Sequence, residues 1–159
     1  MDLSSLVDGR YMFNGCTNLT SFSGDLSSLT NGEYMFNVTG LTSFNNDLSS
    51  LTNGNAMFSN CPNLSSFSSN LSSISNGNAM FVNCTSLTSF DNDLSSLTDG
   101  GNMFMGCNKL TYFSGDLSSL TNGNGMFSAT RLDAPSVANI IHTIKDRTGL
   151  PTPSYYEGT

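Results

Sequence analysis

The feature of this sequence that most restricts its fold is a unit that recurs every 22 or 23 residues. Each unit opens on the tetrad Asp-Leu-Ser-Ser, with Asn for Asp in one case, and the tetrads begin at Asp2, Asp25, Asp47, Asn70, Asp93 and Asp116. Five units are complete, and the sixth departs from the pattern after Phe127. A unit this short cannot bury a core alone, so we expect the units to stack as coils, each in contact with its neighbours only.

The apolar residues of the unit recur at fixed positions, which indicates which side chains lie inside. A Met-Phe pair recurs in every unit, as in Met12-Phe13. A second Phe recurs further along, at Phe22, Phe44, Phe67, Phe90 and Phe113. Equivalent side chains lie about 4.8 Å apart if neighbouring coils pair as strands. The pattern therefore predicts a continuous core, with a soft binding groove of Met and Phe as the alternative.

Composition and charge exclude two classes of partner. The chain has a formal net charge of −7 and only five Lys and Arg residues, so it has no basic patch for nucleic acid. Its apolar content is 37%, and no apolar run approaches the roughly 20 residues of a membrane-spanning helix. We therefore expect neither nucleic-acid binding nor membrane insertion by this chain.

Four cysteines occupy one position of the unit, at Cys16, Cys61, Cys84 and Cys107, and Val38 or Thr39 stands there in the shortened second unit. Side chains stacked in one column point the same way, which is poor geometry for a disulfide. Cysteine also packs as a small buried apolar residue. We expect a column of free thiols; a disulfide and a metal site are the alternatives.

One turn of the coil contains a strand, a cap and a tight turn. Residues 19–23 carry Thr and Phe with partial alternation, which predicts the strand. The Asp that follows can cap a short helical turn. The pair Asn31-Gly32 and its equivalents predict a tight turn, because both residue types tolerate positive φ.

The run MFNGCTNLTSF at residues 12–22 resembles the BspA-like leucine-rich repeats of bacterial surface proteins. The pattern DLSSL…MF is similar to the related repeats of bacterial surface lipoproteins, and the resemblance extends over residues 2–127. It implies a curved solenoid with a short strand in each turn, surface display, and adhesion or binding of host components. It implies no particular ligand. We expect an extracellular or cell-surface location, with any secretion signal outside this sequence.

The predicted fold is a β-solenoid, a leucine-rich-repeat-like right-handed coil of about six repeats with short strands, over residues 1–130. Residues 131–148 predict an amphipathic helix, with Pro135 near its start and one apolar face formed by Val137, Ile140, Ile141 and Ile144. We expect this helix to cap the core, with partner binding as the alternative. Residues 149–159 predict a surface tail or an interrupted further element.

The outward face of the predicted strands is the first candidate site. We expect it to bind a glycan or a protein through Tyr112, Ser21, Ser43, Ser66, Ser89 and Asp91. Tyr112 is the one aromatic residue among these outward positions, which makes it the best single candidate. Tyr11 and Tyr34 add aromatic side chains in a variable turn.

A column of acidic residues is a weaker candidate, for calcium. It comprises Asp25, Asp47, Asp93 and Asp116, with Asn70 between them. Stacked carboxylates repel one another, and calcium prefers oxygen ligands. The alternative is a set of exposed turn or cap residues. We expect no other cofactor.

Catalysis has no visible basis, because His142 is the single histidine and no nucleophile motif accompanies it. We expect a non-catalytic extracellular binding or adhesion module. The alternative is a structural spacer repeat of a larger surface protein or a phage tail fibre. The uncapped N-terminal coil is an unpaired edge, which predicts a homodimer through that coil.

Overall fold

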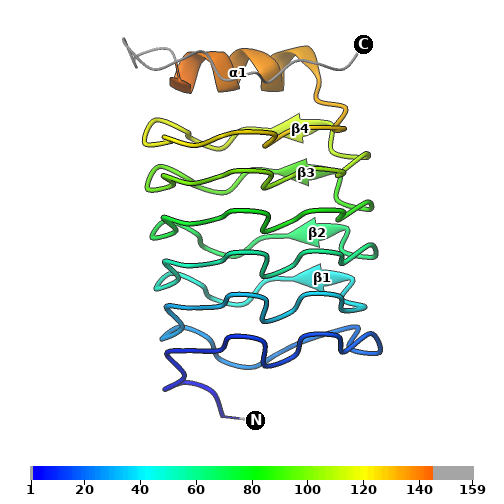
Figure 1. Cartoon of the computed structure of the whole chain (residues 1–159), viewed down its shortest axis with the longest axis vertical. Coiled ribbons are helices and arrows are strands. Elements are labelled where there is room, and N and C mark those ends of the chain that lie inside the picture. The colour runs from blue at the N-terminus through cyan, green and yellow to red at the C-terminus, as the bar shows by residue number, and fades with distance from the viewer. Residues whose placement is uncertain (1, 145–159) are drawn as a thin grey trace.

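The computed structural model describes residues 2–144 as a stack of similar coils with a helix across the C-terminal end (Figure 1). The strands are β1 (Ser43–Phe44), β2 (Ser66–Phe67), β3 (Ser89–Phe90) and β4 (Tyr112–Phe113), and the helix is α1 (Ala134–Ile144). β1 pairs in parallel with β2, and β3 with β4. The repeat solenoid expected from the sequence is therefore present, although each strand has two residues instead of the predicted five.

A second ladder runs along the other side of each coil, through the turn segment, which we define as residues 9–15 and their equivalents. In the first coil the N–H groups of Gly9, Tyr11, Phe13 and Gly15 donate to carbonyls of the second coil over 2.8–3.0 Å. Within the segment, the N–H of Met12 donates back to the carbonyl of Gly9. The ladder is directional, because these N–H groups all point toward the next coil. The turn-segment ladder thus joins every pair of neighbouring coils, including those of β2 and β3, whose strands do not pair.

The turn segment holds two residues in the left-handed region. The first position is occupied by Tyr11, Tyr34, Ala56, Ala79, Asn102 and Gly125, and the second by Gly15, Val38, Asn60, Asn83, Gly106 and Ala129, with φ between 51° and 77°. The expectation that Asn31-Gly32 itself adopts positive φ is wrong. Gly32 is required for space, because a Cβ there would lie 2.8 Å from the Sδ atom of Met57 in the next coil.

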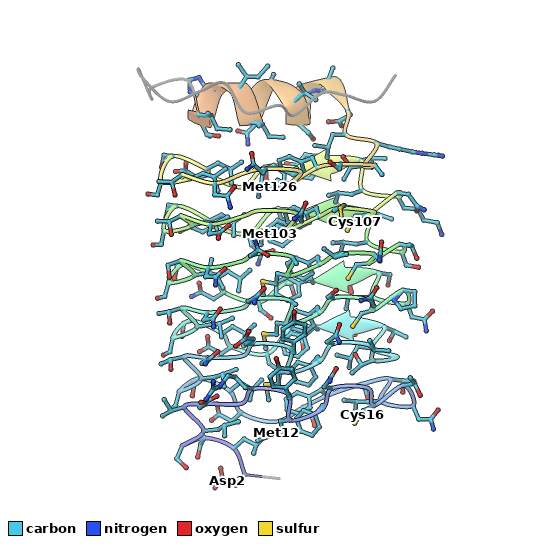
Figure 2. The ribbon with its side chains drawn as sticks, in the orientation of Figure 1. Asp2, Met12, Cys16, Met103, Cys107 and Met126 are labelled. Carbon is cyan, nitrogen blue, oxygen red and sulfur yellow. The ribbon has the colours of Figure 1, made fainter. Side chains whose placement is uncertain are left out.

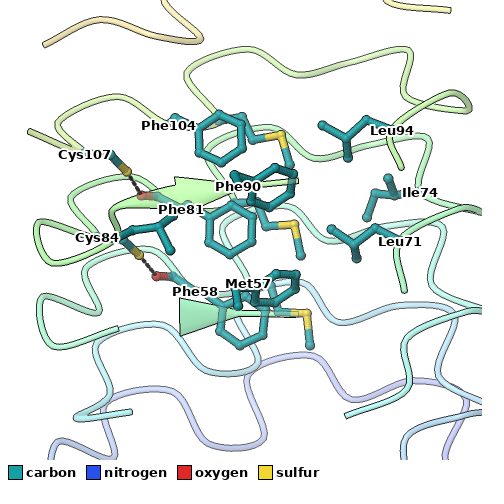
Figure 3. Packing of buried hydrophobic residues seen from close by; sticks show 14 of the residues in the cluster. Met57, Phe58, Leu71, Ile74, Phe81, Cys84, Phe90, Leu94, Phe104 and Cys107 are labelled. Atoms are coloured by element: carbon teal, nitrogen blue, oxygen red, sulfur yellow. Dashed lines mark hydrogen bonds between the residues drawn. The ribbon is translucent and has the colours of Figure 1, made fainter. Parts of the chain in front are cut away.

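Two columns of phenylalanine form the centre of the core, as the repeat pattern predicts. Rings of the Phe36, Phe58 and Phe81 column stack 5.5–5.6 Å apart, and rings of the Phe44 and Phe67 column stack 6.0 Å apart. The columns meet edge to face, and Met57 and its equivalents lie beside them (Figure 3). The first column comes from the turn segments and the second from the strands. The strands and the turn segments are therefore opposite walls of one core.

The C-terminal coil is covered by α1, which lies across the end of the stack in the place of a further coil (Figure 1). The hydroxyl of Ser136 accepts a 2.9 Å hydrogen bond from the N–H of Phe113 at the end of the strand ladder. Asn139 Nδ2 donates to the carbonyl of Gly115 over 3.3 Å. Ile140 is buried, but Ile141 is 59% exposed, so its assignment to the apolar face is wrong. The cap therefore depends on polar side chains as well as on the apolar stripe.

The N-terminal coil is less buried than the coils behind it. Phe13 and Phe22 are only partly buried, and Met12 is 42% exposed, whereas Met103 and Met126 lie one above the other inside the stack (Figure 2). The division into residues 1–130, 131–148 and 149–159 remains a prediction, since residues 145–159 lie outside the described part of the chain.

Candidate binding surfaces

The outward positions of the strands, with Asp91 directly after β3 and Ser21 at the equivalent position of the first coil, form one exposed face, here called the strand face. Its members are Ser21, Ser43, Ser66, Ser89, Asp91 and Tyr112, all of which are exposed. They alternate with the buried phenylalanines because successive side chains of a strand point to opposite sides. The register places Ser43 beside Ser66, and Ser89 beside Tyr112. The structure thus brings the predicted ligand-binding residues onto a single surface.

The serines of the strand face have free hydroxyl groups. Within residues 2–144, Ser43, Ser66 and Ser89 make no side-chain hydrogen bond to the protein. The neighbouring column behaves differently, since the Thr111 hydroxyl donates to the carbonyl of Thr88 over 3.3 Å. Tyr112 is 45% exposed and is the single large apolar surface beside these hydroxyls. This face offers hydrogen-bond donors and acceptors around one aromatic ring.

The acidic column lies along the turns that follow the strands. In each case the carboxylate accepts a hydrogen bond from a backbone N–H two residues later, as Asp25 does from Ser27 over 2.9 Å and Asp47 from Ser49 over 2.8 Å. The hydrogen bond from the Ser27 backbone is the main cause of the lowered pKa of Asp25. Asn70 accepts the equivalent bond from Ser72 over 2.9 Å, so this capping role does not require a charge.

The described residues contain no group of three or more His, Cys, Asp or Glu side chains that could hold a metal ion. Calcium binding by the acidic column of Asp25, Asp47, Asp93 and Asp116 stays a prediction. His142, the single histidine of the sequence, lies exposed on α1.

The cysteines form the predicted column of free thiols. Cys84 Sγ donates to the carbonyl of Phe58 over 3.2 Å, and Cys107 Sγ to the carbonyl of Phe81 over 3.1 Å (Figure 3). Burial raises the pKa of the Cys107 thiol to about 12 and that of Cys84 well above its ordinary value. Thr39 takes the cysteine position in the second coil, with its hydroxyl 3.2 Å from Cys61 Sγ. Cys61, Cys84 and Cys107 are therefore structural groups of the core, whereas Cys16 in the first coil is exposed.

An amide ladder runs beside the turn segments and was not predicted from the sequence. Asn53 Nδ2 donates to Asn31 Oδ1 over 3.0 Å, and Asn76 Nδ2 donates to Asn53 Oδ1 over 3.1 Å. Asn122 Nδ2 likewise donates to Asp99 Oδ1 over 2.9 Å. The Asn that recurs before Gly in the sequence could have indicated this amide ladder, but it was interpreted only as part of a tight turn.

A stacked aromatic pair lies on the turn segments of the first two coils. The rings of Tyr11 and Tyr34 have centroids 5.0 Å apart and planes inclined by 5°. Tyr11 is 53% exposed, and Tyr34 is half-buried. The sequence marked both residues as aromatic variations in a turn but gave no indication that their rings stack.

The stacked coils, the repeated core columns and the exposed strand face together define a repeat solenoid of the leucine-rich kind. Comparison with known protein families matches residues 7–111 and 32–148 to the BspA type leucine-rich repeat region, in six copies. These stretches cover most of the chain, and the chain belongs to this family. No curated protein and no solved structure matches it.

Repeats of this family occur in bacterial surface proteins and are typically non-catalytic binding modules. No helix in the described part of the chain is long and apolar enough to cross a membrane.

Proposed function

We propose that this protein is a non-catalytic extracellular binding or adhesion module that recognises a host or environmental ligand through the strand face. The observation that carries the proposal is the exposed row of unpaired hydroxyls with Tyr112, 45% exposed, at one end. Repeat proteins use such regular surfaces for binding. We also infer a right-handed coil, the sense that parallel crossover connections almost always take.

The chemistry of the strand face suits a glycan or a polar protein segment. The hydroxyls of Ser43, Ser66 and Ser89 can each donate and accept, and Asp91 adds an acceptor. Tyrosine supplies a large rigid contact area at low cost in conformational entropy, which is why it is enriched where proteins bind partners. Tyr112 is thus the expected anchor, with the serines fixing the orientation of the ligand.

A second function, a structural spacer, is favoured by the even spacing of the core residues from coil to coil. The turn-segment column Phe36, Phe58, Phe81, Phe104 and Phe127 keeps ring spacings of 5.5–5.6 Å throughout. A stack this regular has the stiffness that a stalk of a larger surface protein or a phage tail fibre needs. A spacer carries no ligand on its strand face, so ligand binding distinguishes the two functions.

The N-terminal coil is the proposed contact of a homodimer. Its Phe13 and Phe22 are only partly buried, and a second copy would cover them. In the turn segment, however, the N–H groups point away from this end, so two copies facing each other would oppose carbonyl to carbonyl. The contact would therefore depend on apolar side chains. Light scattering after size exclusion, at increasing protein concentration, tests this; a monomer at every concentration excludes the dimer.

The proposed ligand is tested on an array of glycans and mucins, comparing the wild-type chain with Tyr112→Ser, in calcium and in chelator. Serine is the matched replacement, because Ser89 occupies the paired position in the neighbouring strand. We expect binding by the wild type and its loss in the variant. Loss in chelator alone would instead support calcium at the acidic column. No binding on this array or on an array of extracellular host proteins would support the spacer.

A further inference from the structure

The stacked pair of Tyr11 and Tyr34 is a candidate site that the strand face does not include. The rings are parallel within 5°, 5.0 Å apart, and Tyr11 is 53% exposed. We propose that the Tyr11 ring, held in place by the Tyr34 ring stacked on its other face, binds the flat apolar face of a neutral pyranose sugar, at a site separate from the strand face.

The fold does not account for aromatic side chains at these two positions. Tyr11 and Tyr34 have φ values of 59° and 54°, in the left-handed region that bulky residues rarely occupy. The other coils place smaller residues at the same position, such as Ala79, Asn102 and Gly125. The fold requires the left-handed turn, but it does not require an aromatic residue there.

Polar groups of the kind that recognise hydroxyls flank both tyrosines. Arg10 directly precedes Tyr11, and its Nη2 lies 2.9 Å from Asp8 Oδ2 in an exposed ion pair. Glu33 directly precedes Tyr34, and its Oε1 accepts a 3.2 Å hydrogen bond from Asn55 Nδ2. Carboxylate, amide and guanidinium groups together can donate to and accept from the vicinal hydroxyls of a sugar.

The negative charge around this site favours a neutral ligand. The local groups Asp8, Glu33 and Arg10 sum to one negative charge, and the whole chain carries −7. Sulfated sugars, sialylated sugars and nucleotides would be repelled by this field. A pyranose whose ring hydroxyls are equatorial offers a flat C–H surface to an aromatic ring without adding charge.

The position of the site makes it independent of the strand face. Phe13 and Phe36 project inward from the same turn segments and meet Phe22 and Phe44 of the opposite wall, edge to face or tilted, at 4.9–5.4 Å. The outward side chains of the two walls therefore face opposite directions. One ligand ring cannot contact Tyr11 and Tyr112 together, so each site can be removed by itself.

The test is calorimetric titration of the full chain with three neutral probes: cellohexaose, laminarihexaose and mannohexaose. Tyrosine emission provides a second readout, because the chain contains no tryptophan. The variants are Tyr11→Ala and Tyr34→Ala, with Tyr112→Ser as the control for the strand face. Alanine is a matched replacement, since Ala56 and Ala79 hold the same conformation at φ 51° and 54°.

We expect at least one probe to bind, with affinity reduced about tenfold or more in Tyr11→Ala and in Tyr34→Ala, as for loss of an aromatic anchor. Ser118→Ala, added as the neutral control at an exposed residue outside both surfaces, should bind like the wild type. The proposal is overturned if none of the three probes binds, or if both alanine variants retain their affinity and their circular dichroism. Loss confined to Tyr112→Ser would also overturn it, while supporting the strand face.

Discussion

Replacing Val38 by Asn should stabilise the protein. Val38 is a β-branched residue at φ 57°, in a conformation that costs an ordinary L-residue about 1–2 kcal/mol. Asparagine tolerates it, and Asn60 and Asn83 already occupy the equivalent position at φ 57° and 58°. Asn83 Nδ2 donates to Asn60 Oδ1 over 2.9 Å, and an Asn at position 38 would extend that pair by one coil.

The expected gain follows from three contributions. Relief of backbone strain contributes about 1–2 kcal/mol, and a new partly exposed hydrogen bond about 0.5–1 kcal/mol. Val38 is 39% exposed, so losing its buried methyl groups costs about 1 kcal/mol. The free energy of unfolding should therefore rise by about 1 kcal/mol. Urea unfolding followed by far-UV circular dichroism measures this as a higher midpoint with an unchanged slope.

The matched control places the same two residues at Gly15, the equivalent position of the first coil. Gly15 has φ +75°, and a Cβ added there meets no atom within 4 Å, so a substitution tests backbone strain alone. Gly15→Val should be less stable than Gly15→Asn by about 1 kcal/mol. Equal stability of these two variants, or a loss of stability in Val38→Asn, would refute the reasoning.

Four further predictions concern the core, the cap and the thiols. Phe81→Ala, in the fully buried centre, should cost about 3–5 kcal/mol by urea unfolding, whereas Phe13→Ala, with a neighbouring coil on one side only, should cost about half as much. Ser136→Ala removes the acceptor of the Phe113 N–H and should cost about 1–3 kcal/mol, with Ser118→Ala, on the surface, as its neutral control. Since burial raises the pKa of Cys107 to about 12, the neutral thiol is favoured in the fold; its contribution to stability is complete below pH 9 and should be lost as the pH rises toward 12, measured by unfolding at each pH. At pH 8 a thiol reagent should modify the exposed Cys16 and leave the buried cysteines unmodified until urea is added.

The sequence predicted the core of this fold well, because each core position is written again in every coil. Phe58 and Phe81 are buried where the pattern places them, and the free cysteines follow from the same argument. Thr39 shows the limit of the pattern. The shortened coil left Val38 or Thr39 as the substitute for Cys, and the hydrogen bond of Thr39 to Cys61 identifies which one it is.

The backbone of the turn segment could not be predicted from residue types. Its left-handed positions carry Tyr, Ala, Asn, Val and Gly, because the ladders to the neighbouring coils impose the conformation whatever the residue. The general preference of Asn and Gly for positive φ therefore pointed to the wrong residues as the left-handed positions. The burial of Ser136 was not predicted for a related reason. The apolar stripe of the helix predicts which apolar residues are buried, but it does not show that the Phe113 N–H needs a hydrogen-bond acceptor.

For the proposed binding surface, the sequence predicted which residues lie on the exposed face but not a ligand. Alternation along the strand places Ser43 and Ser66 outward, and the structure confirms their exposure. Which ligand they meet does not follow from the fold, since an outward side chain is free to vary without loss of packing. The stacking of Tyr11 on Tyr34 depends on the distance between coils and on a left-handed backbone, and neither can be read from one sequence.

The central claim, that the strand face binds a ligand through Tyr112, is tested most directly by surface plasmon resonance on immobilised mucin, which presents many glycans on a protein chain. The wild type, Tyr112→Ser and Tyr34→Ala are compared at equal concentrations. The account predicts that Tyr112→Ser weakens binding by about tenfold or more, chiefly through faster dissociation. Wild-type binding that Tyr112→Ser leaves unchanged would contradict it.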